Sequence, residues 1–313
     1  MVGAEDAGTT LAAALRRRAP DKSWSEVKRL CETGKVRLDG AVALDPAVRL
    51  AAGQSIVLDM AAPKPRPETP GFRIAFEDGH IVVIEKPSGV STVPYERKEA
   101  GTALDLIRSA WRRTGKHATA TPLYTVHRID KDTSGLVCFA KTRLAERGLH
   151  EVFQRHLAAR LYLAVAEGAV APQRIESRLI ADRGDGLRGS TRRANEGQHA
   201  VTHVEPVRQL RGVAGTRVLA TLCKVSLETG RTHQIRIHLA ERGHPLVGET
   251  VYVRDLRRAG ETPLPAPRLM LHAALLGFDH PVSGAALEWR ATPPPDFLSV
   301  LRDLGGVDDD VHL

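Results

Sequence analysis

The sequence predicts an α+β protein in two parts, a small N-terminal module and a larger domain. Four prolines fall within the eleven residues 61–71, a density that neither a helix nor an inner strand tolerates. Beyond them, strand-like and helix-like segments lack the regular alternation of a parallel βαβ fold. We therefore predict a module at 1–60, a linker at 61–72, a domain at 73–303 and an acidic tail at 304–313.

The N-terminal module begins with two predicted helices. The apolar pattern of residues 11–18 is typical of a short helix. Ser23 then stands three residues before Glu26, which is the spacing of a capping box at a helix start. Gly34 suits the end of this second helix, whose apolar side is formed by Val27, Leu30 and Cys31.

A small sheet is predicted to follow these helices. Val36 and Leu38 alternate with basic residues, Asp39-Gly40 is a strong hairpin turn, and residues 56–58 supply a closing strand. This arrangement would bring four basic side chains near one another: Lys28, Arg29, Lys35 and Arg37. Such a surface could bind phosphates, although an ordinary solvated helix and hairpin would carry the same charges.

The larger domain opens with the apolar run 81–84, which is typical of a buried strand and ends at Lys86-Pro87. Thr142 is placed to cap a helix whose apolar side consists of Ala145, Leu149, Val152 and Phe153. We expect an exposed loop at 183–197 and disorder at 306–313. Further strands are expected at Tyr162–Val165, Val218–Leu227 and Gln234–Leu239.

Composition narrows the functional classes. The chain is 42% hydrophobic and 26% charged, and no stretch approaches the roughly 18 consecutive apolar residues of a membrane span. The N-terminus lacks the apolar segment of a secretory signal, and the three cysteines are far apart, so we expect a cytoplasmic protein with reduced thiols and no membrane partner. An excess of 45 basic over 37 acidic residues favours a polyanionic partner.

Charged clusters lie beside apolar strands at 127–130, 160–162 and 228–233. Burying a lone carboxylate is costly, so an aspartate at the edge of a strand needs either a cationic partner or a reactive role. Each cluster taken alone is more typical of a structural ion pair than of an active site.

The three histidines His233, His238 and His244 raise the question of a metal site. Their spacings of five and six differ from the zinc-protease motif, which needs two histidines four residues apart, so we predict no metal. Ser134-Gly135 lacks the hydrolase elbow, and the glycines of 184–189 match neither a P-loop nor a dinucleotide fingerprint. No cofactor is therefore predicted.

The segment HRIDKDTSGLVCFAK closely resembles the signature segment of the RluA-type pseudouridine synthases. EDGHIVVIEKPSGV, which precedes it, is similar to the opening strand of that family. Three later segments follow in the family's order and are similar to those that carry its tyrosine, its arginine and its closing part: FQRHLAARLYLAVAEG, LETGRTHQIRIHLAERGHPLVGE and RLMLHAALLGFDHPVSG.

This resemblance implies a mixed, mainly antiparallel sheet with flanking helices and a central catalytic cleft. It also implies a cofactor-free isomerisation of uridine within RNA, in which the glycosidic bond to the ring nitrogen breaks and one to a ring carbon forms. A base paired or stacked in RNA must first be extracted, and bases in loops are extracted at the lowest cost.

The resemblance also assigns catalytic roles to three residues. Asp130 matches the catalytic aspartate, which would attack the substrate covalently or remove a ribose proton. Arg231 matches the arginine that pairs with this aspartate. Tyr162 matches the tyrosine that stacks on the target uracil.

Other matching residues imply RNA contacts or support. Arg128 would enter the space left by the flipped base. Arg160 stands where the family commonly has lysine and would contact phosphate. His127 matches the motif, either as an RNA contact or, in the interpretation that we favour, as a hydrogen-bonded structural histidine. Lys86 and Thr133 would support the site.

The N-terminal module resembles the S-four-like RNA-binding module, although Trp24 stands where that family usually has arginine. The module favours a structured RNA, so we expect a monomer acting on large-subunit ribosomal RNA, with transfer RNA as the alternative. A non-catalytic RNA-binding or ribosome-assembly factor with the same fold stays open as a rival. The rival differs in predicting that Asp130 is dispensable.

Overall fold

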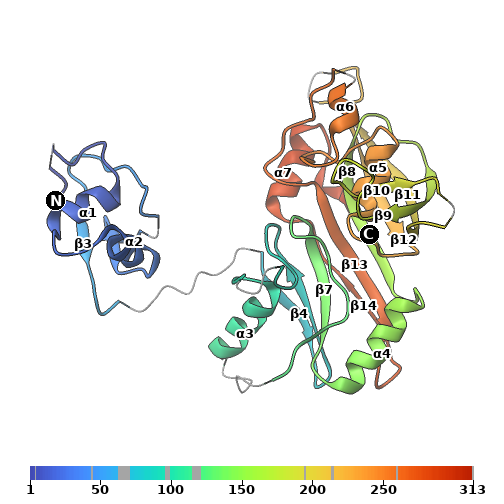
Figure 1. Ribbon diagram of the computed structural model, residues 1–313, viewed down its shortest axis with the longest axis horizontal. Coiled ribbons are helices and arrows are strands. Elements are labelled where there is room, and N and C mark those ends of the chain that lie inside the picture. The colour runs from blue at the N-terminus through green and yellow to red at the C-terminus, as the bar shows by residue number, and fades with distance from the viewer. Residues whose placement is uncertain are drawn as a thin grey trace. The chain divides into compact units, whose positions relative to one another are not determined.

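The computed structural model divides the chain into two compact units, Met1–Glu68 and Thr69–Leu313 (Figure 1), and each is described by itself. Residues 63–70, which include most of the predicted linker, lie outside the part of the chain that the structure describes. That part comprises residues 1–3, 5–43, 45–62, 71–95, 99–114, 121–193, 195–212, 215–258 and 260–311.

The N-terminal unit packs two helices against a three-stranded antiparallel sheet of order β2-β1-β3. Its elements are α1 (Leu11–Arg18), α2 (Trp24–Glu32), β1 (Val36–Leu38), β2 (Ala41–Val42) and β3 (Ile56–Leu58). The capping box of Ser23 and Glu26 is confirmed. The hairpin turn is also confirmed, because Asp39 and Gly40 have φ values of 51° and 82°. Every element predicted in this unit is present.

The described residues of the second unit form one eleven-stranded sheet, in which β10-β9-β11-β12-β8-β13-β7-β5-β4 run side by side while β14 pairs with β13 and β6 with β7. The strands are β4 (Arg73–Glu77), β5 (Ile81–Lys86), β6 (Tyr124–Thr125), β7 (Ser134–Ala140), β8 (Ala159–Glu167), β9 (Gln173–Ile180), β10 (Gly189–Thr191), β11 (Gln198–Leu210), β12 (Ala220–Leu227), β13 (Leu271–Asp279) and β14 (Ala286–Arg290). Among these strands only β7 and β13 pair in parallel. The predicted mixed, mainly antiparallel sheet is confirmed.

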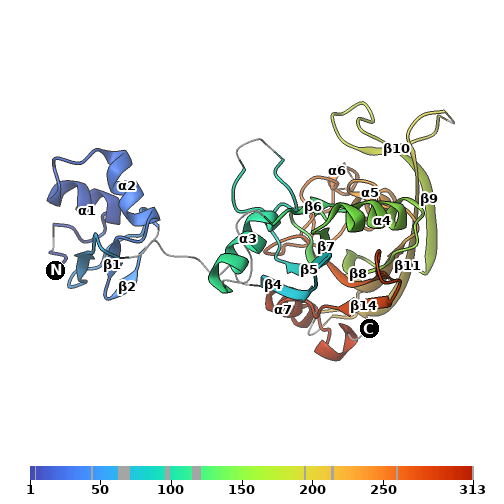
Figure 2. The same ribbon diagram turned by 90° about the horizontal axis from the view of Figure 1, so that it is seen from below.

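Helices cover both faces of this sheet, as Figure 2 shows for α5 and α7. Successive side chains of β8 point to opposite faces of the sheet. Tyr162 and Ala164 pack with the residues of α5, whereas Leu163 and Val165 pack with those of α7. The helices are α3 (Ala103–Thr114), α4 (Arg143–Gln154), α5 (Gln234–Glu241), α6 (Arg254–Arg258), α7 (Pro295–Asp303) and the 3₁₀ helix η1 (Asp308–Val311). None of the described helices has the length and hydropathy needed to cross a membrane.

The strand prediction for Gln234–Leu239 was wrong, because these residues begin helix α5. Ile235, Ile237 and Leu239 alternate with polar residues as in a strand, yet all six residues from Gln234 to Leu239 are buried. A helix enclosed on every side does not show the 3.6-residue periodicity of a surface helix. This error also affected the interpretation of the active site, since α5 carries one of its arginines.

Two predictions of irregular structure need correction. Residues 306–313 were expected to be disordered, but η1 buries Val311 in the apolar layer beneath α7, and Asp310 pairs with Arg208 at 3.0 Å. The expected loop at 183–197 contains the short edge strand β10. In both cases tertiary contacts override a polar local sequence.

Candidate active site

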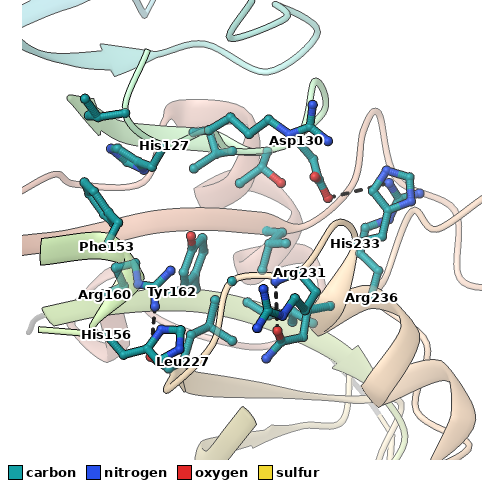
Figure 3. A pocket seen from close by; sticks show the side chains of 18 of the residues that line it. His127, Asp130, Phe153, His156, Arg160, Tyr162, Leu227, Arg231, His233 and Arg236 are labelled. Carbon is teal, nitrogen blue, oxygen red and sulfur yellow. Dashed lines mark hydrogen bonds and ion pairs between the residues drawn. The ribbon is translucent and has the colours of Figure 1, made fainter. Parts of the chain in front are cut away.

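A cleft of about 380 Å³ opens where the turn before β7, strand β8 and the segment before α5 meet. Figure 3 shows His127 and Asp130 along one wall, with Arg160 and Arg231 along the other. The cleft brings together seven of the residues predicted from the sequence: His127, Arg128, Asp130, Thr133, Arg160, Tyr162 and Arg231. Its volume lies within the range of small-molecule sites, which run from about 300 to 1,000 Å³.

Asp130 lies on a turn whose backbone is fixed on both sides. The Thr92 hydroxyl donates to the carbonyl oxygen of Ile129 at 2.7 Å and accepts from the Ile129 N–H at 3.3 Å. The N–H of Thr133 donates to the carbonyl oxygen of Asp130 at 3.1 Å, which closes the turn. The side chain of Asp130 keeps 21% of its surface exposed and faces the cleft, so it is accessible to a substrate.

Lys86 supports this turn from beneath. Its side chain is buried, and the Nζ donates to the carbonyl oxygens of Pro87, Val90 and Lys131 at 2.9, 2.6 and 2.9 Å. Burial lowers the pKa of Lys86 to about 7, while its three acceptors use every donor of the protonated form. Lys86 therefore links the loop 87–90 to the catalytic turn, which is the supporting position expected for it.

Arg236, rather than the expected Arg231, is the arginine that pairs with Asp130. The Nη1 of Arg236 lies 3.8 Å from Oδ2 of Asp130. Glu249 holds the same guanidinium with two hydrogen bonds, from Nε at 2.7 Å and from Nη2 at 2.8 Å. Glu249 is itself buried and accepts three backbone N–H groups, from Thr250, Val251 and Tyr252.

The sequence segment that contains Arg236 was interpreted as a strand, although it forms a helix. Arg236 lies in the segment GRTHQIRIHLAERGHPLVGE, five residues after Arg231 and thirteen before Glu249. Reading the segment as a strand gave no reason to prefer the later arginine. In the helix, Arg236 belongs to the first turn of α5 and is 6% exposed, so its charge requires the two carboxylates beside it.

Arg231 lines the cleft without approaching Asp130 as an ion-pair partner. Its Nε donates to the carbonyl oxygen of His199 at 3.0 Å, and its N–H donates to Oε1 of Gln234 at 3.0 Å. Gln234 is buried and also accepts from the Thr229 hydroxyl at 2.8 Å. The loop 229–234 is therefore fixed internally, and it presents the charge of Arg231 to the cleft on the wall opposite Asp130.

Tyr162 presents a mostly buried ring to the cleft from β8, packed in the apolar cluster that includes Ile129 and Leu271. Burial raises the pKa of its phenol, so the group stays neutral near pH 7. Arg160, two residues earlier, donates from Nη2 to the carbonyl oxygens of Leu227 and Glu228, both at 3.4 Å. A neutral aromatic surface thus lies beside a cation.

Arg128 is exposed at the mouth of the cleft, where its Nη2 donates to the Thr232 hydroxyl at 3.1 Å. His127, two positions before Ile129, is turned into the protein instead. Its Nε2 accepts from the Cys138 N–H at 2.9 Å, and its ring stacks on Phe153 with centroids 4.3 Å apart. Burial lowers the pKa of His127 to about 3, so the structure supports the structural role of this histidine rather than an RNA contact.

The three histidines considered for a metal each have another hydrogen-bond partner. His233 pairs through Nδ1 with the Tyr252 hydroxyl at 2.7 Å, His238 contacts the hydroxyls of Thr202 and Ser177, and His244 contacts the carbonyl oxygen of Glu167. In the described ranges no three His, Cys, Asp or Glu side chains are grouped as metal ligands would be. The His233–Tyr252 pair, which sequence reasoning missed, lies beside Arg236, whose guanidinium is 5.3 Å from the centre of the Tyr252 ring.

The basic residues predicted in the N-terminal unit differ in their availability. Lys28 and Arg29 are exposed on α2. Lys35 donates to the carbonyl oxygen of Ala62, and Arg37 donates to that of Gly40 at 2.9 Å. Lys28 and Arg29 are therefore the better candidates for contacts outside the protein.

Comparisons with known proteins identify the family to which this chain belongs. A family model described as RNA pseudouridylate synthase matches residues 80–241. "Ribosomal large subunit pseudouridine synthase D" of Zymomonas mobilis is 34% identical over 291 residues, which cover 90% of this chain and 89% of the relative. The protein of the same name from Pseudomonas aeruginosa is 33% identical over 296 residues, covering 90% and 88%.

A solved structure supports the fold alone. The structure titled "Human RNA Pseudouridylate Synthase Domain Containing 1" aligns with a TM-score of 0.56 at 21% identity, covering 72% of this chain and 84% of that one. The matched family segment contains Asp130, Tyr162 and Arg236. This chain therefore belongs to the RNA pseudouridylate synthase family and is an isomerase that modifies uridine in RNA.

Proposed function

We propose that this protein isomerises one or more uridines of large-subunit ribosomal RNA, with Asp130 as the reactive carboxylate. The observation that carries the proposal is the position of Asp130. Its carboxylate faces a cleft that also contains the ring of Tyr162, and the guanidinium of Arg236 lies 3.8 Å away. In a cofactor-free rearrangement of a nucleoside, a carboxylate can act as nucleophile or base, an aromatic ring can stack on the base, and a fixed cation keeps the carboxylate ionised.

The reaction needs one bond to break and one to form at the same sugar carbon. The carboxylate of Asp130 either adds covalently to the substrate or removes a ribose proton, after which the bond between N1 of uracil and C1′ breaks. The freed base turns and C5 bonds to C1′. Before the product leaves, the covalent bond to Asp130 breaks or, on the other path, the carboxylate returns the ribose proton. The proton on C5 is lost to a base and N1 takes up a proton, so atoms balance without an oxidant or a cofactor.

The surrounding side chains suit a base turned out of its RNA strand. The ring of Tyr162 can stack on the uracil, because it is neutral and largely enclosed by apolar neighbours. Arg160 and Arg231 supply positive charge on the same wall, where the phosphates flanking the target would lie. Arg128 at the mouth is exposed and has a planar cation that can replace the base in the stack.

Large-subunit ribosomal RNA is favoured over transfer RNA by the names of the relatives. We propose that this unit is an S-four-like module that contacts structured RNA through Lys28 and Arg29. We further propose that the protein works as a monomer in the cytoplasm.

The test uses the purified full chain and large-subunit ribosomal RNA transcribed in vitro with tritium at C5 of uridine. Turnover releases tritium to water, because C5 loses its hydrogen. We expect Asp130→Asn to release none while its affinity for the RNA stays within about twofold, since the carboxylate is one of many contacts. Absence of release by the unaltered protein would favour the rival, a non-catalytic RNA-binding factor, whereas equal release by the variant would show that Asp130 is not the reactive group. Turnover of transfer RNA in place of ribosomal RNA would redirect the substrate.

A further inference from the structure

A second cavity, of about 840 Å³, adjoins the active-site cleft. The two share a wall formed by Arg128, Ile129, Asp130 and His233. The remaining lining comes chiefly from residues 91–95 and includes Arg188. A uridine held at Asp130 is joined by phosphodiester bonds to the nucleotide on each side of it. One neighbouring nucleotide can therefore enter the second cavity while the target base occupies the cleft.

Tyr95 lines this second cavity and is 91% exposed. The chain has only three Trp, four Tyr and six Phe residues, and Trp24, in the other unit, is the one further exposed aromatic side chain among those described. An isolated exposed aromatic residue needs no explanation, but this one lies in a cavity that reaches the catalytic aspartate. Aromatic rings stack on any base, and such stacking is largely independent of sequence.

The backbone that carries Tyr95 is fixed to the catalytic turn. The Tyr95 N–H donates to one carboxylate oxygen of Glu99 at 2.7 Å, and the Ser91 hydroxyl donates to the other at 2.6 Å. Thr92 bonds to both backbone groups of Ile129. Because the loop 91–95 is already ordered, little conformational entropy is lost when a base stacks on the ring.

Arg188 supplies an uncommitted positive charge in the same cavity. It is exposed, and in the described part of the chain no hydrogen bond or ion pair engages it. Of the two other cations that line this cavity, Arg128 bonds to the Thr232 hydroxyl at 3.1 Å and is assigned to the space left by the flipped base, and Lys131 pairs with Glu99 at 3.6 Å. Arg188 is therefore the cation best placed to bind a phosphate of the RNA strand.

We propose that the second cavity is a subsite for a nucleotide adjacent to the target uridine, whose base stacks on Tyr95 and whose backbone phosphate is bound by Arg188. The inference rests on the proposed RNA substrate and extends it by one nucleotide. It assigns Tyr95 to substrate positioning, outside the chemical step.

The test measures affinity of the full chain for a hairpin RNA whose loop holds a uridine that is modified in cells. All proteins carry Asp130→Asn, so that no turnover occurs. We expect Tyr95→Ala to weaken binding at least about fivefold, while Tyr95→Phe, which keeps the ring, stays within about twofold. Arg188→Ala should reduce the slope of log affinity against log salt by about 0.7, as for loss of one phosphate contact on a single strand. Arg302→Ala removes an exposed arginine on α7 that pairs with Asp308 and lines neither cavity; it is the control for loss of one surface charge and should leave RNA affinity unchanged.

Removing the base next to the target locates the subsite. An abasic nucleotide on one side of the uridine should weaken RNA binding by the protein that retains Tyr95 as much as Tyr95→Ala does. It should weaken RNA binding by the Tyr95→Ala protein no further. The proposal is overturned if the Tyr95→Ala protein binds the intact hairpin normally. It is also overturned if an abasic nucleotide on either side of the uridine lowers the RNA affinity of both proteins equally. Failure of the proposed function would look different. The protein with Asp130 intact would not convert the hairpin, whereas the Tyr95 and Arg188 effects on affinity would persist.

Discussion

Replacing Arg236 with methionine separates its structural role from its role at the active site. Arg236 is 6% exposed and lies between two carboxylates, Glu249 through two hydrogen bonds and Asp130 at 3.8 Å. Methionine keeps an unbranched side chain but removes the charge. The change therefore leaves Glu249 buried without its cation and Asp130 without its fixed neighbour.

Two magnitudes follow from these contacts. Removing one partner of a buried ion pair costs about 3–5 kcal/mol of folding free energy, and the three backbone N–H donors that remain on Glu249 place the expected loss near the lower value. At 3.8 Å and an effective dielectric constant of about 20, the interaction of Arg236 with Asp130 is worth about 4 kcal/mol. Loss of one preorganised group of this kind typically lowers the rate by about 10²–10³.

The double variant Arg236→Met with Glu249→Gln distinguishes the two effects. The glutamine side chain is neutral and its carbonyl oxygen can still accept the backbone N–H groups, so we expect most of the folding free energy to return. The rate should stay low, because the cation beside Asp130 is still missing. Urea denaturation measures the first quantity, and single-turnover tritium release from C5-labelled RNA measures the second.

Two results would refute this reasoning. Full activity in the Arg236→Met protein would show that Asp130 does not need the cation. Recovery of activity together with stability in the double variant would show that Arg236 acts only through folding.

Three further outcomes are expected. Gly135→Ala should destabilise the protein by about 3 kcal/mol or more, because its Cβ would lie 2.2 Å from a carbonyl oxygen of β13. Gly284→Ala, which has open space around it, should destabilise the protein less. Equal losses of unfolding free energy in urea denaturation would contradict this prediction. Lys86→Met should leave three carbonyl oxygens unpaired, at about 1–3 kcal/mol each, and should lower turnover; an unchanged melting temperature would count against the supporting role. Burial lowers the pKa of His238 and of His272 to about 4, so these histidines take up protons in the unfolded chain before they do so in the folded protein as the pH falls below about 6.5. Each histidine should therefore lower the free energy of unfolding by roughly 2 kcal/mol at pH 5. A urea midpoint equal at pH 7 and pH 5 would disprove this prediction.

Local signals in the sequence predicted the N-terminal unit well. The capping box at Ser23 and the turn at Asp39-Gly40 depend on interactions within a few residues, so their residue types are sufficient to place them. The strands 81–84 and 162–165 were predicted equally well, since both are continuous apolar runs.

The sequence motifs predicted which residues line the active-site cleft, but not which arginine pairs with Asp130. Asp130, Tyr162 and Arg231 do line one cleft, but the partner of Asp130 is set by where α5 begins. The first six residues of that helix are buried, and it starts after His233, whose φ of 57° is rare for a residue with a side chain. Neither property leaves a periodic pattern, so the choice between Arg231 and Arg236 required the tertiary structure.

The most direct measurement of the central claim is a map of pseudouridines in large-subunit ribosomal RNA from cells that lack this gene. We predict that at least one uridine loses its modification, that the unaltered gene restores it, and that the Asp130→Asn gene does not. An unchanged map in the deletion strain, or restoration by Asp130→Asn, would contradict the assignment of Asp130 as the reactive group of a ribosomal RNA pseudouridine synthase.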